Sequence, residues 1–274
     1  MANNDEELLR LLPKVLRARD FHLYTEGGKR FVDLWLQGGR AVLGHKPPGF
    51  LLELKNAAER GLFSPFPHPL ERRLTKALAV FFPDRSFRFY NDSISMFHAI
   101  KKALSGKGAS FNCSAIPDPA FPDTNAEKVN VTLWRPFVEP LPQAPILIPV
   151  LPWPLGPAVL ALDKGMDASF PQGELIPPVL LAPAARALYD LAAQIRSRNS
   201  SRQRYYRVEK AIGSVWQRRG IYLTTRVDGE KYAELFRSFL EAGFLLPPQA
   251  SEPVILPAVM SKGEETQLAK LLTG

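Results

Sequence analysis

The sequence predicts an α/β protein, and three observations support this prediction. Two short apolar runs, 21–24 and 31–36, flank a glycine-containing turn and indicate a β-hairpin near the start of the chain. Further along, a strand is expected at 87–90 and a helix at 94–104. With 274 residues, of which 46% are hydrophobic and 23% charged, the chain is long enough for one large and one small domain.

Glycines govern the predicted hairpin and the segment that follows it. The turn reads Thr25-Glu26-Gly27-Gly28-Lys29, and glycine adopts the positive φ angles of a tight turn without steric cost. Gly38-Gly39 and Leu43-Gly44-His45 come next, where small residues suggest that the backbone passes close to other groups. A helix is then expected from about Phe50 to Arg60.

The composition excludes several classes of protein. The single cysteine, Cys113, rules out an intrachain disulfide framework and suits a reducing cytosol. The first residues, MANNDEELLRLLPKVL, are acidic and polar where a secretory leader would be basic and then apolar. The run from Pro145 to Leu162 is uncharged, but its five prolines make a membrane-spanning helix untenable. We therefore expect a cytoplasmic protein with no membrane partner, in which this run forms buried strand and loop.

The net charge of +8 is concentrated in one segment. Between Arg196 and Arg219, eight Arg and Lys side chains stand against Glu209 alone, a net of +7. Three aromatic residues are interleaved with them: Tyr205, Tyr206 and Trp216. One interpretation is a nucleic-acid surface. The other is a solvated pair of helices at 182–198 and 202–218, which we favour because no nucleic-acid-binding motif accompanies the charge.

The histidines and phosphate-loop patterns give no separate site. His22, His45, His68 and His98 lack the spacing of metal ligands, so no metal site is expected. We interpret His98, three residues after Ser95, as a packed helix residue rather than a catalytic one. Neither a P-loop nor a G-x-G-x-x-G motif is present.

Three segments of the chain resemble one enzyme family. They read LYTEGGKRFVDLWLQGGRAVLGHKPP from Leu23, AAERGLFSPFPHPLERRLTKALAVFFP from Ala57, and YAELFRSFLEAGFLLPPQASEPVILPAVMSKGEETQLAKLL from Tyr232. These segments are similar to class III pyridoxal-phosphate (PLP) aminotransferases, especially the glutamate-1-semialdehyde aminomutase branch. In that family a strand pair reading YDxDGxRYxD is followed by LGHxHP and by a helix that opens on ELE. Leu70-Glu71 stands at this helix start.

The resemblance implies the fold-type I PLP-dependent aminotransferase architecture, with a trimmed large domain and a smaller α+β domain. Residues 1–45 would be an N-terminal segment that packs with the small domain or at a dimer interface. Residues 46–198 would form the trimmed large α/β domain, and residues 199–274 the C-terminal small domain. Because the family builds its site at a dimer interface, we expect a homodimer with 38–48 close to the second subunit.

Lys164 is the candidate for covalent chemistry. In the family, the lysine that forms a Schiff base with PLP lies in GKxLGGGFPxG, and this chain reads DKGMDASFPQG from Asp163 to Gly173. The lysine and Phe170-Pro171 match this motif without a gap, after an expected strand at 159–162. The chain departs from the motif at 167–169, where an acid and two small residues replace three glycines. The alternative is a surface lysine after a strand.

The family's phosphate-binding motif is degenerate in this chain. The family reads NSGTEAxxxAIKLAR, in which Ser-Gly-Thr holds the phosphate at a helix N-terminus. This chain reads NDSISMFHAIKKAL from Asn91, with Asp92, Ser93 and Ile94 in place of Ser, Gly and Thr. Asp92 or Ser93 makes a good N-cap, so a carboxylate could satisfy the amides that a phosphate would otherwise occupy. We expect PLP binding to be weak or absent.

Other cofactor groups of the family are missing or altered. The acid of FDEV, which pairs with the pyridine nitrogen, has no counterpart, and Pro149 stands near its place in ILIPVLPW. The aromatic-His lid YHG is absent from the segment after Leu104. The loop TxSGNP, which reaches the neighbouring subunit's phosphate, is shortened to Glu174–Pro178, with Glu174 where a hydroxyl belonged.

Two functions remain open on these observations. One is a degenerate aminotransferase-like protein with little or no transaminase activity, which binds a partner through the old cleft or through 196–219. The other is an active PLP-dependent aminotransferase or aminomutase that acts on an amino acid or amino aldehyde through a Schiff base at Lys164. We favour the first, because the lysine is retained while most of the pocket is lost.

Overall fold

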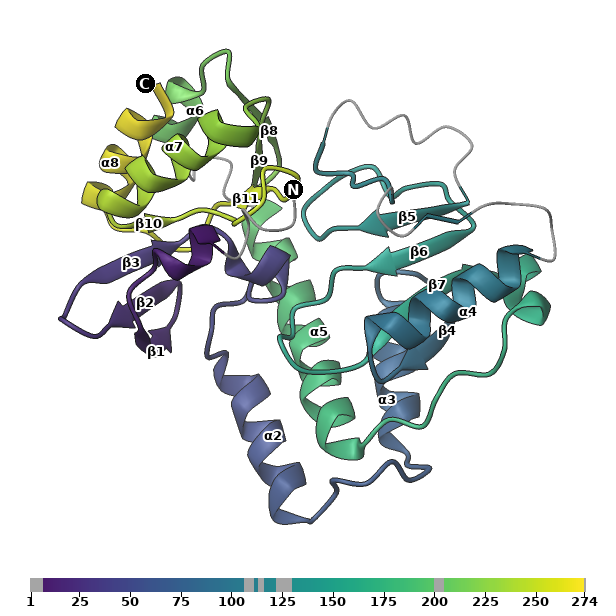
Figure 1. The fold of residues 1–274 in the computed structure, drawn as a ribbon. Helices are drawn as coiled ribbons and strands as arrows, with labels where there is room; N and C mark the ends of the chain where they lie inside the picture. Colours follow the sequence, from purple (N-terminus) through teal and green to yellow (C-terminus); the bar gives the residue numbers. More distant parts are fainter. Residues whose placement is uncertain (1–6, 106–110, 113–115, 122–129, 200–204, 274) are drawn as a thin grey trace. The chain divides into compact units, whose positions relative to one another are not determined.

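The computed structural model describes residues 7–105, 111–112, 116–121, 130–199 and 205–273. Cys113 lies outside these residues. The chain divides into two compact units (Figure 1). The first unit comprises Met1–Pro47, Ala120–Pro122 and Arg196–Gly274, and the second comprises Pro48–Pro119 and Asp123–Ile195.

The N-terminal hairpin shares a sheet with a strand from the C-terminal part of the chain. In this sheet β1 (Val15–Arg19), β2 (His22–Thr25) and β3 (Arg30–Asp33) are antiparallel neighbours, and β10 (Phe244–Leu245) pairs with β3 in parallel. The predicted hairpin is confirmed by β2 and β3. Its turn contains Gly27 and Gly28 with φ angles of 91° and 83°.

The segment after the hairpin is anchored by a buried aspartate. Asp33 is 1% exposed, and its Oδ1 accepts hydrogen bonds from the amides of Trp35 and Leu36 at 2.8 and 2.9 Å. Its Oδ2 lies 2.9 Å from Nε2 of His45. A Cβ at Gly44 would lie 3.0 Å from the Asp20 carbonyl oxygen, so the expected close backbone approach is present.

The rest of the first unit is a three-stranded sheet with helices. Its strands are β8 (Trp216–Arg219), β9 (Tyr222–Thr225) and β11 (Val254–Ile255), in the order β11-β9-β8. Its helices are α6 (Tyr206–Ala211), α7 (Gly229–Glu241) and α8 (Lys262–Thr273).

The predicted helix over 202–218 is therefore wrong. In the described part of that range, only α6 is helical, and Trp216–Arg219 is a strand that pairs with β9. Gly220, with a φ angle of 62°, makes the tight turn between these two strands. The run of arginines suggested a solvated helix, but Trp216 is 4% exposed and faces the core.

The second unit contains the helices expected from the sequence. They are α2 (Pro48–Glu59), α3 (Leu70–Ala79), α4 (Ser93–Ser105) and α5 (Pro178–Asn199). The helices expected near 50–60, from Leu70, at 94–104 and at 182–198 are thus confirmed, with ends that differ by a few residues. Leu54 and Ala57 of α2 pack with Val179 and Ala182 of α5.

The sheet of the second unit has the strand order β4-β7-β6-β5. Its strands are β4 (Arg85–Tyr90), β5 (Val131–Trp134), β6 (Ile146–Pro149) and β7 (Ala158–Asp163). β7 is antiparallel to both β4 and β6, while β5 and β6 are parallel. Hence β4, β5 and β6 point the same way, and β7 points the opposite way. The strands expected within the uncharged run are confirmed by β6 and β7.

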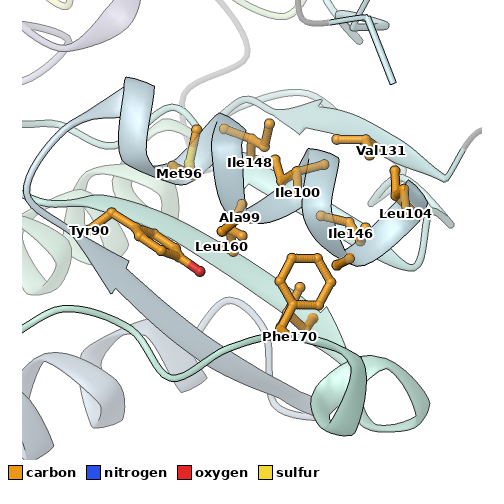
Figure 2. Packing of buried hydrophobic residues seen from close by; sticks show 12 residues of the cluster. Tyr90, Met96, Ala99, Ile100, Leu104, Val131, Ile146, Ile148, Leu160 and Phe170 are labelled. Carbon is orange, nitrogen blue, oxygen red and sulfur yellow. The ribbon is translucent and has the colours of Figure 1, made fainter. Parts of the chain in front are cut away.

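One face of this sheet is covered by α4 (Figure 2). Met96, Ile100 and Leu104 recur every four residues along the helix and pack in one cluster with Ile146 and Leu160 of the sheet. Ile100, Ile146 and Leu160 are fully buried. Burying such a side chain contributes about 1.5–3 kcal/mol, so this cluster fixes the start of α4 relative to the end of β4.

Among the described helices, none is both long and apolar enough to cross a bilayer.

Candidate active-site edge

Three strands of the second unit end at the same edge of their sheet. Because β4, β5 and β6 point the same way, the residues that follow them, Asn91, Arg135 and Val150, lie along this edge. In open α/β sheets, ligands bind outside the carboxyl ends of the strands. We call this edge the carboxyl edge.

At the carboxyl edge, Asp92 caps α4. Its Oδ1 accepts a hydrogen bond from the Ser95 amide at 2.7 Å. This bond from the Ser95 backbone is the main cause that lowers the pKa of the Asp92 carboxyl below its ordinary value. Ser93 begins the helix, and the Ile94 side chain is 69% exposed. One amide that could hold an anion is therefore already satisfied by the chain's own carboxylate.

Glu174 brings a second carboxylate to the same turn. Its Oε2 accepts hydrogen bonds from both the backbone N and Nδ2 of Asn91, each at 2.8 Å. The bond from the Asn91 backbone is the main cause that lowers the pKa of the Glu174 carboxyl, and the charge of Asp92 opposes this shift. The structure thus brings Asn91, Asp92, Ser93, Ile94 and Glu174 together, as one turn and the segment that contacts it.

Lys164 does not belong to this group. It follows β7, which runs antiparallel to β4 with Asp163 opposite Arg85 and Ala158 opposite Tyr90. Lys164 is therefore at the start of β4, whereas Asn91 follows its end. Six strand residues separate the two places, about 20 Å at 3.3 Å per residue, which neither a lysine side chain nor a pyridoxal ring can bridge. Lys164 is exposed, and its Nζ lies 3.4 Å from Oδ1 of Asp84.

The end of β5 carries a buried ion pair that the sequence analysis missed. Nε and Nη2 of Arg135 donate to Oδ1 and Oδ2 of Asp118 at 2.7 and 2.6 Å, and the side chains are 5% and 13% exposed. Each charge thus neutralises the other, so Asp118 is not available to a pyridine nitrogen. A charged residue directly after the apolar run VTLW was the signal that could have identified Arg135.

The segment that connects β6 to β7 packs tightly on itself. Trp153 is 4% exposed, and its Nε1 donates to the Pro157 carbonyl oxygen at 3.2 Å. A Cβ at Gly156, whose φ angle is 148°, would lie 2.9 Å from the Trp153 ring. No lysine occurs between Asn130 and Asp163, so no amine follows β5 or β6 at the carboxyl edge.

A cavity of about 410 Å³ lies beside β4. It is lined by Glu71 of α3, by Phe87, Arg88 and Phe89 of β4, and by Gln172, Gly173, Glu174 and Leu175. The Arg88 guanidinium donates to Asp167 Oδ1 at 2.6 Å and to the Pro171 carbonyl oxygen at 3.1 Å. Since Arg88 is paired within the chain, Glu71 and Glu174 make this lining unfavourable for a phosphate.

Three of the four histidines have hydrogen-bond partners within the chain. His22 and His45 contact Glu264 and Asp33, and His68 accepts a hydrogen bond from the Leu70 amide. His98 is exposed on α4, so its interpretation as a packed residue is corrected. No metal-binding group of three acidic, His or Cys side chains occurs among the described residues.

Several of the described basic residues between Arg196 and Arg219 are also engaged. Arg207 donates to Thr266 Oγ1 and to the Lys262 carbonyl oxygen, and Arg218 pairs with Glu209. The Lys210 ammonium lies 4.4 Å from the centre of the Tyr206 ring. These contacts within the chain leave fewer cations for nucleic-acid phosphates, which is why we do not propose a nucleic-acid partner.

Searches by sequence find relatives of undefined function. No family model matches the chain. An uncharacterized protein of Treponema pallidum is 27% identical over 298 residues, covering 92% of each chain. An uncharacterized protein of Borreliella burgdorferi is 26% identical over 277 residues, covering 97% of this chain and 93% of the relative.

Solved structures that share the fold include aminotransferases. Ornithine delta-aminotransferase of Plasmodium falciparum superposes with a TM-score of 0.67 at 11% identity, covering 98% of this chain and 97% of its own. An omega-transaminase of Sphaerobacter thermophilus also gives 0.67, at 12% identity, covering 99% and 96%. Acetylornithine aminotransferase of Elizabethkingia anophelis gives 0.66 at 12% identity, covering 98% of each chain. The predicted fold-type I aminotransferase architecture is confirmed, and identities this low establish the fold alone.

Proposed function

We propose that this chain is an aminotransferase-like protein that does not carry out transamination and that acts by binding a partner, in the cytoplasm. The observation that carries the proposal is the direction of β7, which puts Lys164 at the opposite edge of the sheet from the turn after β4. A PLP enzyme holds the aldehyde carbon of the cofactor at a lysine and its phosphate group at an anion site. The lysine and the anion site must therefore be no farther apart than the two ends of one small molecule.

The residues at the carboxyl edge support the same conclusion. Glu174 and Asp92 occupy the amides of Asn91 and Ser95, and Arg135 is bound to Asp118. Pyridoxal chemistry requires a carboxylate that keeps the pyridine nitrogen protonated and a lysine within reach of the ring. The described residues of this edge supply neither in a usable form, so the group does not fit here.

An absorbance titration with PLP tests the proposal. We expect no protein-bound chromophore beyond free PLP, and no covalent label after borohydride reduction and peptide mass analysis. A label on Lys164, together with turnover of an amino acid or amino aldehyde that Lys164→Ala abolishes, would instead support the active PLP-dependent enzyme. Random labelling of several exposed lysines would count as non-specific and would leave the proposal standing.

We also propose that the protein is a homodimer, with 38–48 close to the second subunit. The homodimer, as distinct from the position of 38–48, is supported by α2 and the turn after it, which expose large apolar side chains that a second copy could cover. Their exposed fractions are 42% for Leu51, 60% for Leu52, 61% for Phe63 and 58% for Phe66. Light scattering should give twice the chain mass.

A matched pair of variants tests this surface. Leu52→Glu should shift the protein toward monomer, because a desolvated carboxylate opposes apolar contact. Val259→Glu introduces the same charge at a site that is 67% exposed in the first unit, and should leave the assembly unchanged. A wild-type protein that is monomeric at high micromolar concentration would contradict the homodimer.

A further inference from the structure

We propose that the chain supplies its own anion to the turn between β4 and α4, with the Glu174 carboxylate holding the donors of Asn91 in place of an external phosphate. This inference deepens the proposed function and rests on it, since it explains how a fold shared with PLP enzymes closes a phosphate-sized anion site. We call the segment Gln172–Leu175, which carries the carboxylate, the clasp.

The clasp contacts the turn through main-chain and side-chain groups. One carboxylate oxygen of Glu174 accepts two hydrogen bonds of 2.8 Å, from N and Nδ2 of Asn91. Nδ2 of Asn91 also donates to the Leu175 carbonyl oxygen at 3.4 Å. The carboxylate thus occupies a backbone N–H and a side-chain amide in the turn directly before the helix, donors that an external anion at this turn would otherwise use.

The path of the backbone makes this contact a built feature. The Glu174 amide donates to the Phe89 carbonyl oxygen at 2.8 Å, which pins the clasp to the outer edge of β4. A Cβ at Gly173 would lie 2.7 Å from the oxygen and 2.8 Å from the nitrogen of Phe89. Only glycine allows the two backbones to approach this closely, so the position of Glu174 depends on the residue before it.

The charges of the turn exclude a further anion. Asp92 already accepts the Ser95 amide at 2.7 Å, so the turn holds two carboxylates. The lowered pKa of each carboxyl means that both are ionised at neutral pH. A phosphate dianion that approached Asn91 would have to displace one carboxylate while it is repelled by the other. Removal of both carboxylates should therefore open the site, and removal of one should open it partly.

A titration with inorganic phosphate, followed by the amide resonances of Asn91 and Ser95, tests the clasp. In the wild-type protein at neutral pH, neither resonance should respond to millimolar phosphate beyond a chloride control of equal ionic strength. Glu174→Ala should make the Asn91 amide respond to phosphate. The double variant Asp92→Ser with Glu174→Ala should bind phosphate on the order of tenfold more tightly than Glu174→Ala alone. A factor of this size corresponds to the free energy with which a helix N-terminus stabilises an anion. Glu71→Ala removes an acid from the same cavity but leaves Glu174 on the donors of Asn91, so the Asn91 amide should stay unresponsive, as in the wild type.

A second measurement gives its main result on the wild-type protein, so that result does not depend on the folding of any variant. In the wild-type protein the Asn91 amide resonance should titrate at acidic pH with the Glu174 carboxyl, and Glu174→Gln should remove that titration. An Asn91 amide that is insensitive to acid in the wild type, or wild-type binding of phosphate at Asn91, would overturn the clasp. The proposed function fails on a different result, a PLP label at Lys164, so the two failures are distinguishable.

Discussion

The two ends of β4 are each contacted by the chain that leads from β7 to α5, but in different ways. At the start, Lys164 lies 3.4 Å from Asp84, with side chains that are 78% and 87% exposed. At the end, Glu174 accepts the backbone and side-chain N–H groups of Asn91. An exposed ion pair contributes little to stability because water and salt screen it. A hydrogen bond from a main-chain N–H, in contrast, satisfies a donor that would otherwise need water as its partner. The contact of Glu174 with Asn91, and not that of Lys164 with Asp84, is therefore the one that stabilises the structure.

The start of β4 is fixed by another residue. Arg85 is largely buried and donates to the carbonyl oxygens of Ala144 at 2.8 Å and Ala161 at 3.2 Å. Its Nη2 also forms an ion pair with Oδ1 of Asp163 at 3.1 Å. Burial lowers the pKa of its guanidinium, and the charge of Asp163 opposes this shift. Because Arg85 already links β4 to the neighbouring strands, Lys164 can change without loosening that end of the strand.

The largest effect should come from Gly173→Ala. The new Cβ would lie 2.7 Å from a backbone oxygen that no side-chain movement can relieve, so the clasp must shift away from β4. Overpacking of this kind costs about 1–3 kcal/mol. Urea denaturation should show a lower midpoint with an unchanged slope.

Gly165→Ala is the matched control. Gly165 lies in the turn after Lys164, and a Cβ there would meet nothing within 4 Å. Its midpoint should stay close to that of the wild type. Equal losses in the two variants would mean that the clasp is not held as closely against β4 as the structure indicates.

A smaller effect should appear as a change in the pH dependence of stability. The pKa of Glu174 in the folded protein lies below its ordinary value of 4.5, chiefly through the hydrogen bond from the Asn91 backbone. Its contribution is then fully present above that ordinary value and is lost as the pH falls through the folded pKa. Glu174→Gln should therefore be less stable than the wild type at neutral pH, and the two should converge in acid.

Thermal melts from neutral pH to below pH 4 would measure this convergence. Glu71→Gln should keep the wild-type profile, because it leaves Glu174 in place. A gap between wild type and Glu174→Gln that stays constant with pH would show that the variant acts through packing and not through charge.

The sequence predicted the local elements because local patterns determine them. The hairpin at 22–33 followed from two glycines in its turn, and α4 from the resemblance of the chain from Asn91 to a strand-turn-helix motif of the aminotransferase family. The helix over 202–218 was wrong because charge alone does not distinguish a solvated helix from a strand whose Trp216 faces the core. The signal for the strand was the turn glycine, Gly220.

The site was harder to predict because it depends on strand direction. Lys164 matched a family motif by linear spacing, but spacing does not show that β7 runs opposite to β4 and delivers its last residue to the other edge. Asp92 or Ser93 was expected as the N-cap of α4, and the hydrogen bond from the Ser95 amide identifies Asp92. Glu174 was expected at the start of a shortened loop, but its two bonds to Asn91 join residues 83 positions apart and could only be seen in the fold.

The smallest effect should come from Lys164→Ala, and it separates the two ends of β4 most directly. The side chain is 78% exposed and its only hydrogen bond among the described residues is the 3.4 Å contact with Asp84. Loss of such a pair changes stability by no more than about 0.5 kcal/mol, so the melting temperature should stay within error of the wild type. Asp84→Ala should give the same result, and the double variant should show no coupling between the two residues.

The same variant should leave the response of the protein to PLP unchanged, because Lys164 lies about 20 Å of strand away from the turn after β4. If Lys164 formed a specific adduct, the melt of the variant would again be unchanged, but its PLP chromophore would be lost. Lys164 has an acid beside it and lies far from the turn after β4, so we expect an exposed surface amine at the start of β4 whose removal alters neither property.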